Sequence, residues 1–113
     1  MIQTLTALGE PNRLRIVELL RAGPCPVGEI GDRLQLRQPQ VSKHLRVLKK
    51  AGLVQMQPRA QQRLYELRAE PLRELDTWLE PYRRYWNARL DALERHLEIM
   101  DTPVHKRRRR PPT

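Results

Sequence analysis

Side chains suited to nucleic acid gather on one predicted helix, residues 38–51. At about 100° per residue, Val41, Leu45 and Leu48 fall within about 60° of Leu45 and form one apolar face. Amide, hydroxyl and basic side chains occupy the opposite face and its flanks. An α-helix fits the DNA major groove, where glutamine pairs with adenine and arginine or lysine pairs with guanine. DNA contacts are therefore expected from Gln38, Gln40, Ser42, Lys43, His44, Arg46 and Lys50.

Two points about these contacts stay open. His44 is placed equally well for a phosphate contact and for packing on the flank of the helix. The whole polar face would also suit an ordinary solvated helix, which is the alternative to DNA binding.

The distribution of charge favours a polyanion as partner. The formal net charge is +9, of which the segment Lys106 to Arg110 supplies five. Residues 33–63 hold eight lysines and arginines and no acid, while the acids lie before and after this segment. Arg59 and Arg63 lie on either side of a predicted hairpin tip and are expected to contact phosphate or the minor groove, a solvated loop being the alternative.

Other chemistry finds little support in the residues. There is no glycine-rich phosphate loop, and Ser42 and His44 point about 160° apart on a helix, which prevents a nucleophile–base pair. An enzyme is therefore not expected. Cys25 is a lone cysteine without a resolving partner, so a structural or incidental role is favoured over a redox switch. With no secretory signal and no apolar span, the chain is expected in the reducing cytoplasm.

The positions of glycine and proline, together with the spacing of apolar residues, predict a mainly α fold with a two-stranded β-hairpin. Pro39 suits the first position of its helix, and Gly52 suits a left-handed cap at its end. The segment 23–26, with two prolines, is expected to break the chain after the second helix. The predicted elements are helices at 2–8, 11–22, 27–34, 38–51 and 71–100, and strands at 53–57 and 63–67 around a turn at 58–62. This order is that of a winged helix-turn-helix.

The last helix carries an apolar seam with a spacing of about 3.5 residues, as in coiled coils, and Pro81 is expected to interrupt and kink it near 77–80. A seam of this length predicts a homodimer interface, with the first helix packed beside it. The expected interface residues are Ile2, Leu5, Leu8, Leu79, Tyr82, Trp86, Leu90, Leu93 and Leu97. The aromatic residues Trp78, Tyr82, Tyr85 and Trp86 could instead wall a small-ligand pocket, but interface packing is favoured.

Two segments, Leu8 to Leu20 and Gln40 to Val54, resemble the ArsR/SmtB family of bacterial repressors. The resemblance implies a dimeric winged-helix repressor that releases its operator on a signal, often a metal, and that dimerises through its first and last helices. Metal-sensing members carry two cysteines around a valine at the start of the third helix, where this chain has Pro26 and Gly28 around Val27. On the last helix only His96 is present, with Asp91 before it. No metal site and no cofactor are therefore predicted.

The sequence as a whole predicts one DNA-binding and dimerisation domain, residues 1–100, and a disordered basic tail, residues 101–113. The expected partners are a palindromic DNA operator and a second copy of the chain. One alternative is a basic dimer that coats nucleic acid without sequence preference. Another is a metal- or thiol-responsive sensor of the same fold.

Overall fold

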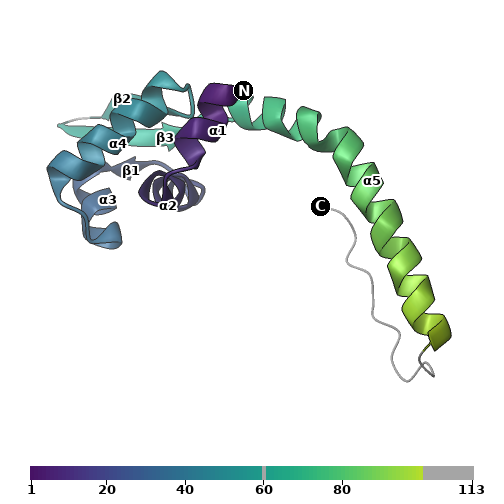
Figure 1. Cartoon of the computed structure of the whole chain (residues 1–113). Coiled ribbons are helices and arrows are strands. Elements are labelled where there is room, and N and C mark those ends of the chain that lie inside the picture. The colour runs from purple at the N-terminus through teal and green to yellow at the C-terminus, as the bar shows by residue number, and fades with distance from the viewer. Residues whose placement is uncertain (60, 101–113) are drawn as a thin grey trace. The chain divides into compact units, whose positions relative to one another are not determined.

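The computed structural model describes residues 1–59 and 61–100, and the predicted tail lies outside them. The chain forms two compact units, one spanning Met1–Thr77 and the other beginning at Trp78. The helices and strands, labelled in Figure 1, are α1 (Ile2–Leu8), α2 (Pro11–Leu20), β1 (Cys25–Pro26), α3 (Val27–Leu34), α4 (Gln38–Lys50), β2 (Val54–Arg59), β3 (Gln62–Leu67) and α5 (Glu70–Met100). No helix of the described residues is long and apolar enough to span a membrane.

The core of the first unit lies where α2, α3 and α4 meet the sheet. Ile16 of α2, Ile30 of α3 and Leu45 of α4 are almost completely buried. The three residues of the predicted inner face of the 38–51 helix are buried together, which confirms that prediction. At about 25 cal/mol per Å² of apolar surface, a cluster of aliphatic side chains is the main source of stability here.

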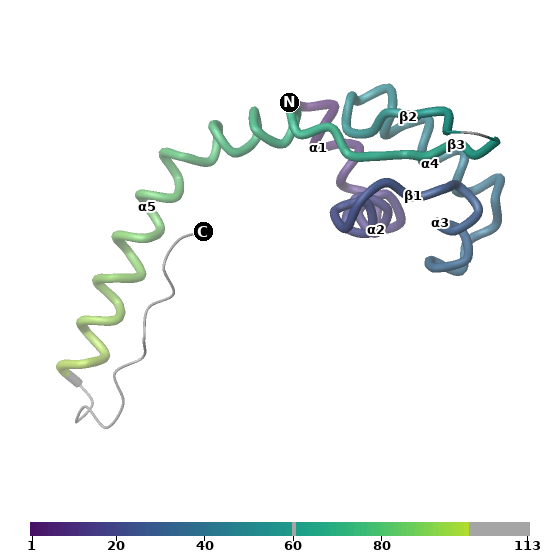
Figure 2. The backbone as a smooth tube through the Cα atoms, turned by 180° about the vertical axis from the view of Figure 1, so that it is seen from behind, coloured from purple at the N-terminus to yellow at the C-terminus, as the bar shows by residue number. Residues whose placement is uncertain are grey.

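The sheet has three strands, where the sequence predicted two. In the order β1-β3-β2, β3 lies in the middle (Figure 2), and Cys25 and Pro26 pair with Tyr65 and Leu64. The segment 23–26 thus ends the second helix, as predicted, but it also supplies an edge strand. Two residues are too few to show alternation, and proline is tolerated on an edge strand because no neighbour needs its missing N–H.

The hairpin reaches closer to its tip than predicted. Pro58 and Arg59, expected in the turn, belong to β2 and pair with Arg63 and Gln62 of β3. Since β2 is the other edge of the sheet, Pro58 again costs no inter-strand hydrogen bond. The first predicted strand residue, Leu53, lies just before β2 and is buried.

A tight turn sets α3 against α4. Gln35 ends α3 in the left-handed conformation, with φ of 57°, and the Leu36 N–H donates to the Gly31 carbonyl at 3.0 Å. The predicted connection at 35–37 is confirmed. Arg37 is the N-cap of α4, so Pro39 occupies the second helical position rather than the first. At the other end Gly52 has φ of 77°, as its predicted capping role requires.

Helix ends elsewhere differ little from expectation. Helix α2 ends at Leu20, two residues earlier than predicted, and Gly23 follows with φ of 140°.

Helix α5 runs through Pro81, so the prediction that this proline interrupts it is wrong. Pro81 lacks the N–H that would donate to the Thr77 carbonyl, and the boundary between the two units falls directly after Thr77. The predicted kink stays a prediction.

Two glycines of α3 allow a test of the turn. A Cβ on Gly31 would lie 3.0 Å from the Leu36 carbonyl oxygen, whereas a Cβ on Gly28 would meet nothing within 4 Å. We expect Gly31→Ala to lower the free energy of unfolding by about 1–3 kcal/mol, since backbone in a hydrogen-bonded turn cannot move aside cheaply. Gly28→Ala should raise it by up to about 1 kcal/mol through helix propensity. Urea unfolding at one protein concentration measures both, and equal stabilities would contradict the packing described.

Candidate nucleic-acid interface

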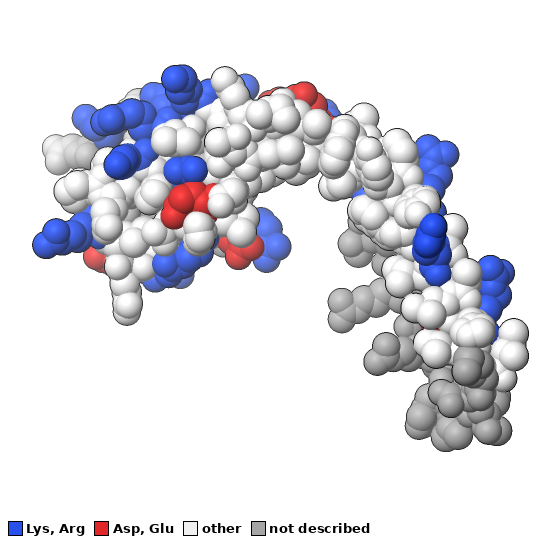
Figure 3. Space-filling view, viewed as in Figure 1, with Lys and Arg blue, Asp and Glu red and all other residues white. Residues whose placement is uncertain are grey.

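The outer face of α4 is exposed and basic. Because Val41, Leu45 and Leu48 are buried against the core, the side chains of Lys43, Arg46 and others on the opposite face point to solvent. Figure 3 shows lysine and arginine side chains gathered over the side of the molecule where α4 lies. Of the predicted DNA-binding residues, the structure places in this exposed group Gln38, Gln40, Ser42, Lys43, Arg46 and Lys50.

Gln40 has a second role at the start of the helix. Its Oε1 accepts a hydrogen bond from the Arg37 backbone N–H at 3.2 Å, so it satisfies a donor next to the first turn. In this conformation its Nε2 stays available as a donor. A two-bond pair with adenine needs both amide atoms, and Gln40 must therefore leave the cap to make one.

His44 turns toward the interior rather than outward. Its side chain is mostly buried, and Nδ1 lies 3.5 Å from Oε2 of Glu10, the N-cap of α2. Nδ1 is fully buried and has no hydrogen bond within the usual geometric limits. Of the two alternatives left open by the sequence, this placement favours packing on the helix flank.

The two arginines of the wing project from opposite faces of the hairpin. Arg59 pairs with Gln62, on the face that also carries Gln57, whereas Arg63 shares its face with Tyr65, which packs against the core. Both arginines are exposed. On the hairpin face that carries Arg59, farther from the tip, Oε1 of Glu66 on β3 accepts hydrogen bonds from the side-chain amides of Gln55 and Gln57 on β2.

Cys25 has the environment of an unreactive thiol. It is buried in β1, and its Sγ lies 3.5 Å from Oε2 of Glu29, to which the thiol donates. Burial, together with the hydrogen bond and the negative charge of Glu29, raises the pKa of Cys25 to about 11. Thiol-based sensing needs the thiolate, so this environment argues against the thiol-responsive alternative. Among the described residues no three His, Cys, Asp or Glu side chains form a group that could hold a metal ion.

In the second unit most of the predicted interface residues form an exposed apolar face on α5, namely Tyr82, Trp86, Leu90, Leu93 and Leu97, whereas Leu79 is half-buried. Tyr82, Leu90 and Leu93 are about half exposed, at 48%, 57% and 53%. The ring of Tyr82 lies 4.9 Å from that of Trp78, and the Arg89 guanidinium stands 4.8 Å from the Tyr85 ring centre. Soluble monomers seldom expose so many large apolar groups in one row, which favours an interface over a solvated helix.

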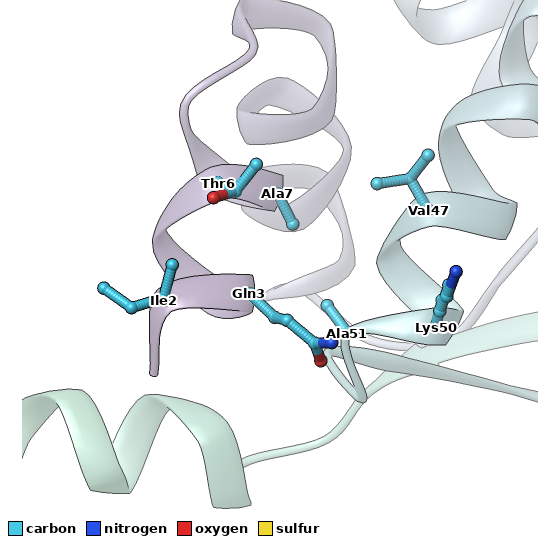
Figure 4. A pocket seen from close by; sticks show the side chains of 7 residues that line it. All are labelled: Ile2, Gln3, Thr6, Ala7, Val47, Lys50 and Ala51. Atoms are coloured by element: carbon cyan, nitrogen blue, oxygen red, sulfur yellow. The ribbon is translucent and has the colours of Figure 1, made fainter.

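Helix α1 divides its apolar residues between the core and the surface. Ala7 is buried and Leu8 packs against the core, while Ile2 and Leu5 are exposed. A groove of about 260 Å³ separates α1 from α4 (Figure 4). Its lining residues are Ile2, Gln3, Thr6, Ala7, Val47, Lys50 and Ala51. The helix with a predicted role in dimerisation thus lies directly beside the helix predicted to enter DNA.

A helix-turn-helix followed by a hairpin wing, with a basic outer face on its second helix, defines the first unit as a winged-helix DNA-binding fold. The profile described as "Bacterial regulatory protein, arsR family" matches residues 10–56. The HTH-type transcriptional regulator Rv2034 of Mycobacterium tuberculosis is 38% identical over 96 residues, covering 85% of this chain and 84% of that protein. The chain therefore belongs to the arsR family of bacterial regulatory proteins and is a winged-helix transcriptional regulator.

Two further relatives extend the comparison. The transcriptional repressor SdpR of Bacillus subtilis is 28% identical, over 70% of this chain and 88% of that protein. The solved structure of HlyU from Vibrio cholerae N16961 superposes with a TM-score of 0.60 at 32% identity, over 72% of this chain and 89% of that one. HlyU of that species is named a transcriptional activator.

Sequence reasoning missed one residue near this surface, Glu10. Part of its signal was present, because a proline in the first turn of a helix marks the residue before it as the N-cap position. What no local pattern could give is the long-range approach of His44 to that carboxylate.

The chemistry of Cys25 can be tested by alkylation. With a pKa of about 11, only about 0.1% of the thiol is ionised at pH 8, against roughly a quarter for an ordinary cysteine. We expect iodoacetamide to label the folded protein at pH 8 at least about a hundredfold more slowly than the urea-unfolded chain, measured by intact mass. The rate should still be rising at pH 10, and rapid labelling at pH 7 would contradict the environment described.

Proposed function

We propose that this protein is a homodimeric repressor that binds a palindromic DNA operator, with α4 of each protomer in the major groove. The observation that carries the proposal is the two-sided character of α4. One face is buried aliphatic, and the other is exposed and lies in a segment, residues 33–63, without a single acidic residue. Such a helix can lie in a groove lined with phosphates, because this segment has no acidic side chain to repel them.

The exposed residues divide into two proposed roles. Gln40, Lys43 and Arg46, on the centre of the outer face, read base edges, since their amide and cationic groups match adenine and guanine. Gln38, Ser42 and Lys50 lie toward the ends and flanks and hold phosphates. At the wing, Arg59 and Arg63 emerge from opposite faces of the hairpin, so one of them reaches the minor groove or backbone while the other contacts a neighbouring phosphate.

Two arguments support the dimer and the direction of regulation. The exposed apolar face of α5, with Trp86, Leu90 and Leu97, leaves water on burial against an identical face, and a two-fold axis then presents two α4 helices to DNA. Among the named relatives, SdpR is a repressor and supports that direction here. The protein acts by binding and not by catalysis.

Base reading is tested at Arg46. We expect Arg46→Ala to weaken binding to the preferred site by about 1–3 kcal/mol and to relax preference at one position in each half-site. Gln40→Ala should do the same and also lower stability slightly, because it removes a cap hydrogen bond. Arg21→Ala, at an exposed position just after α2 and outside the acid-free segment, is the matched control and should leave the preference intact.

Selection from a random duplex pool, followed by titration of the winning sequences, measures these effects. A palindromic consensus with half-sites about 10 bp apart, or a multiple of that, supports the proposal. A flat pool would favour the alternative of a non-specific basic dimer. An unchanged consensus in Arg46→Ala would reassign that residue to phosphate.

The dimer is tested on α5. Leu93→Glu places a carboxylate twice in a symmetric apolar interface and should weaken association by several kcal/mol. Ala88→Glu introduces the same charge five residues earlier, about 140° around the helix, and serves as the control. Light scattering at micromolar concentration should give a monomer for the first variant and a dimer for the second. A Leu93→Glu protein that stays dimeric would place the interface elsewhere.

A further inference from the structure

Two residues at the start of α2, Glu10 and Arg13, connect three helices of the first unit. Oε2 of Glu10 accepts a hydrogen bond from the Arg13 backbone N–H at 2.9 Å and lies 3.5 Å from Nδ1 of His44 on α4. The Arg13 side chain continues the connection to α1. Its Nε donates to the Ala7 carbonyl at 2.7 Å, and its terminal nitrogen donates to the Thr6 carbonyl at 3.3 Å. The end of α1, the start of α2 and the middle of α4 are thus joined at one place.

The electrostatics keep this carboxylate charged. Burial alone would raise the pKa of Glu10. The backbone N–H groups of Arg13 and Asn12, together with the nearby His44 and Arg13 side chains, outweigh burial and lower it. Glu10 is therefore an anion at neutral pH, and its charge 3.5 Å from Nδ1 orients the His44 ring, whose buried Nδ1 has no hydrogen bond.

Such a contact has a distinct effect on α4. The buried residues Val41, Leu45 and Leu48 hold the helix against the core and determine which face is buried, but the hydrophobic effect is non-directional and sets the exact rotation of the helix less sharply. The electrostatic attraction between the Glu10 carboxylate and the His44 ring falls off with distance, so it favours one position of the ring. His44 lies on the same turn of helix as Lys43 and Arg46, so whatever fixes its ring also fixes the positions from which those side chains extend.

We propose that Glu10 is a positioning residue for the DNA-reading helix, which acts through His44 and does not itself touch DNA. Its carboxylate holds α4 at one rotation relative to α2, and Arg13 ties that position to α1. The inference rests on the proposed function, because it assigns what holds the reading face in place. Polar contacts of Arg13 and Glu10 thereby also link α1, the helix expected at the dimer interface, to α4.

The side-chain length of Glu10 allows a sharp test. Glu10→Asp keeps the charge and is at least as good an N-cap as glutamate, but it is one methylene shorter and cannot reach His44. We expect about three- to tenfold weaker binding to the preferred duplex, an unchanged consensus, and a melting temperature within a few degrees of the wild type. Glu18→Asp, the same change at an exposed position of α2, is the control and should alter none of these.

A double-mutant cycle identifies the route. If Glu10 acts through His44, the variant with both Glu10→Asp and His44→Gln binds DNA no more weakly than His44→Gln alone. Additive losses would overturn the proposal. So would tighter binding by Glu10→Gln, the result expected if this carboxylate merely repels the phosphates.

A measurement without DNA separates this inference from the proposed function. Amide hydrogen exchange of the free protein should be faster in α4 of Glu10→Asp than in the wild type, with α3 unchanged. If the wild type selects no consensus but α4 exchanges faster in the variant, the proposed function fails and the positioning role stands. Unchanged exchange in α4 would overturn the positioning role, whatever the protein binds.

Discussion

The burial of one face of α4 is the constraint on which the rest of the site depends. Val41, Leu45 and Leu48 must leave water, and they can do so only if α2, α3 and the sheet form a surface to receive them. Once they are buried, the helix has a single side left for solvent, and every basic residue between Lys43 and Lys50 is directed there or to its flanks. Core packing and the proposed DNA recognition therefore belong to the same thirteen-residue helix, Gln38–Lys50.

Much of the first unit's fold could be predicted because it depends on local sequence patterns. The apolar spacing of α4, the glycine after it and the short turn at Gln35 each act within a few residues, and each is found where the sequence placed it. The family is also confirmed, since the segments that resembled it fall largely within the matched region, residues 10–56. The roles of individual DNA-binding and interface residues stay predictions.

The remaining features depend on contacts between distant residues. Strand β1 exists because β3, about forty positions later, offers Tyr65 and Leu64 as partners. Pro58 joins β2 because that strand happens to be an edge, which no window around Pro58 reveals. The approach of His44 to Glu10 spans two intervening helices in sequence, and helical periodicity placed His44 on a flank without saying what would lie beside it. The face of a helix on which a side chain lies follows from the local sequence, whereas the residue that it contacts is decided by tertiary packing.

The hydrogen bond from Arg37 to Gln40 has a consequence for how such a protein can diverge. The Gln40 side-chain amide supports the first turn of the helix and is also one of the groups proposed to contact DNA, so we expect a substitution there to change folding and recognition together. Lys43 and Arg46 are exposed and extend from the middle of an already formed helix. Descendants that acquire new target sequences should therefore vary first at the mid-helix cations, while the glutamine at the helix start changes late or is replaced by glutamate, which can cap the helix in the same way.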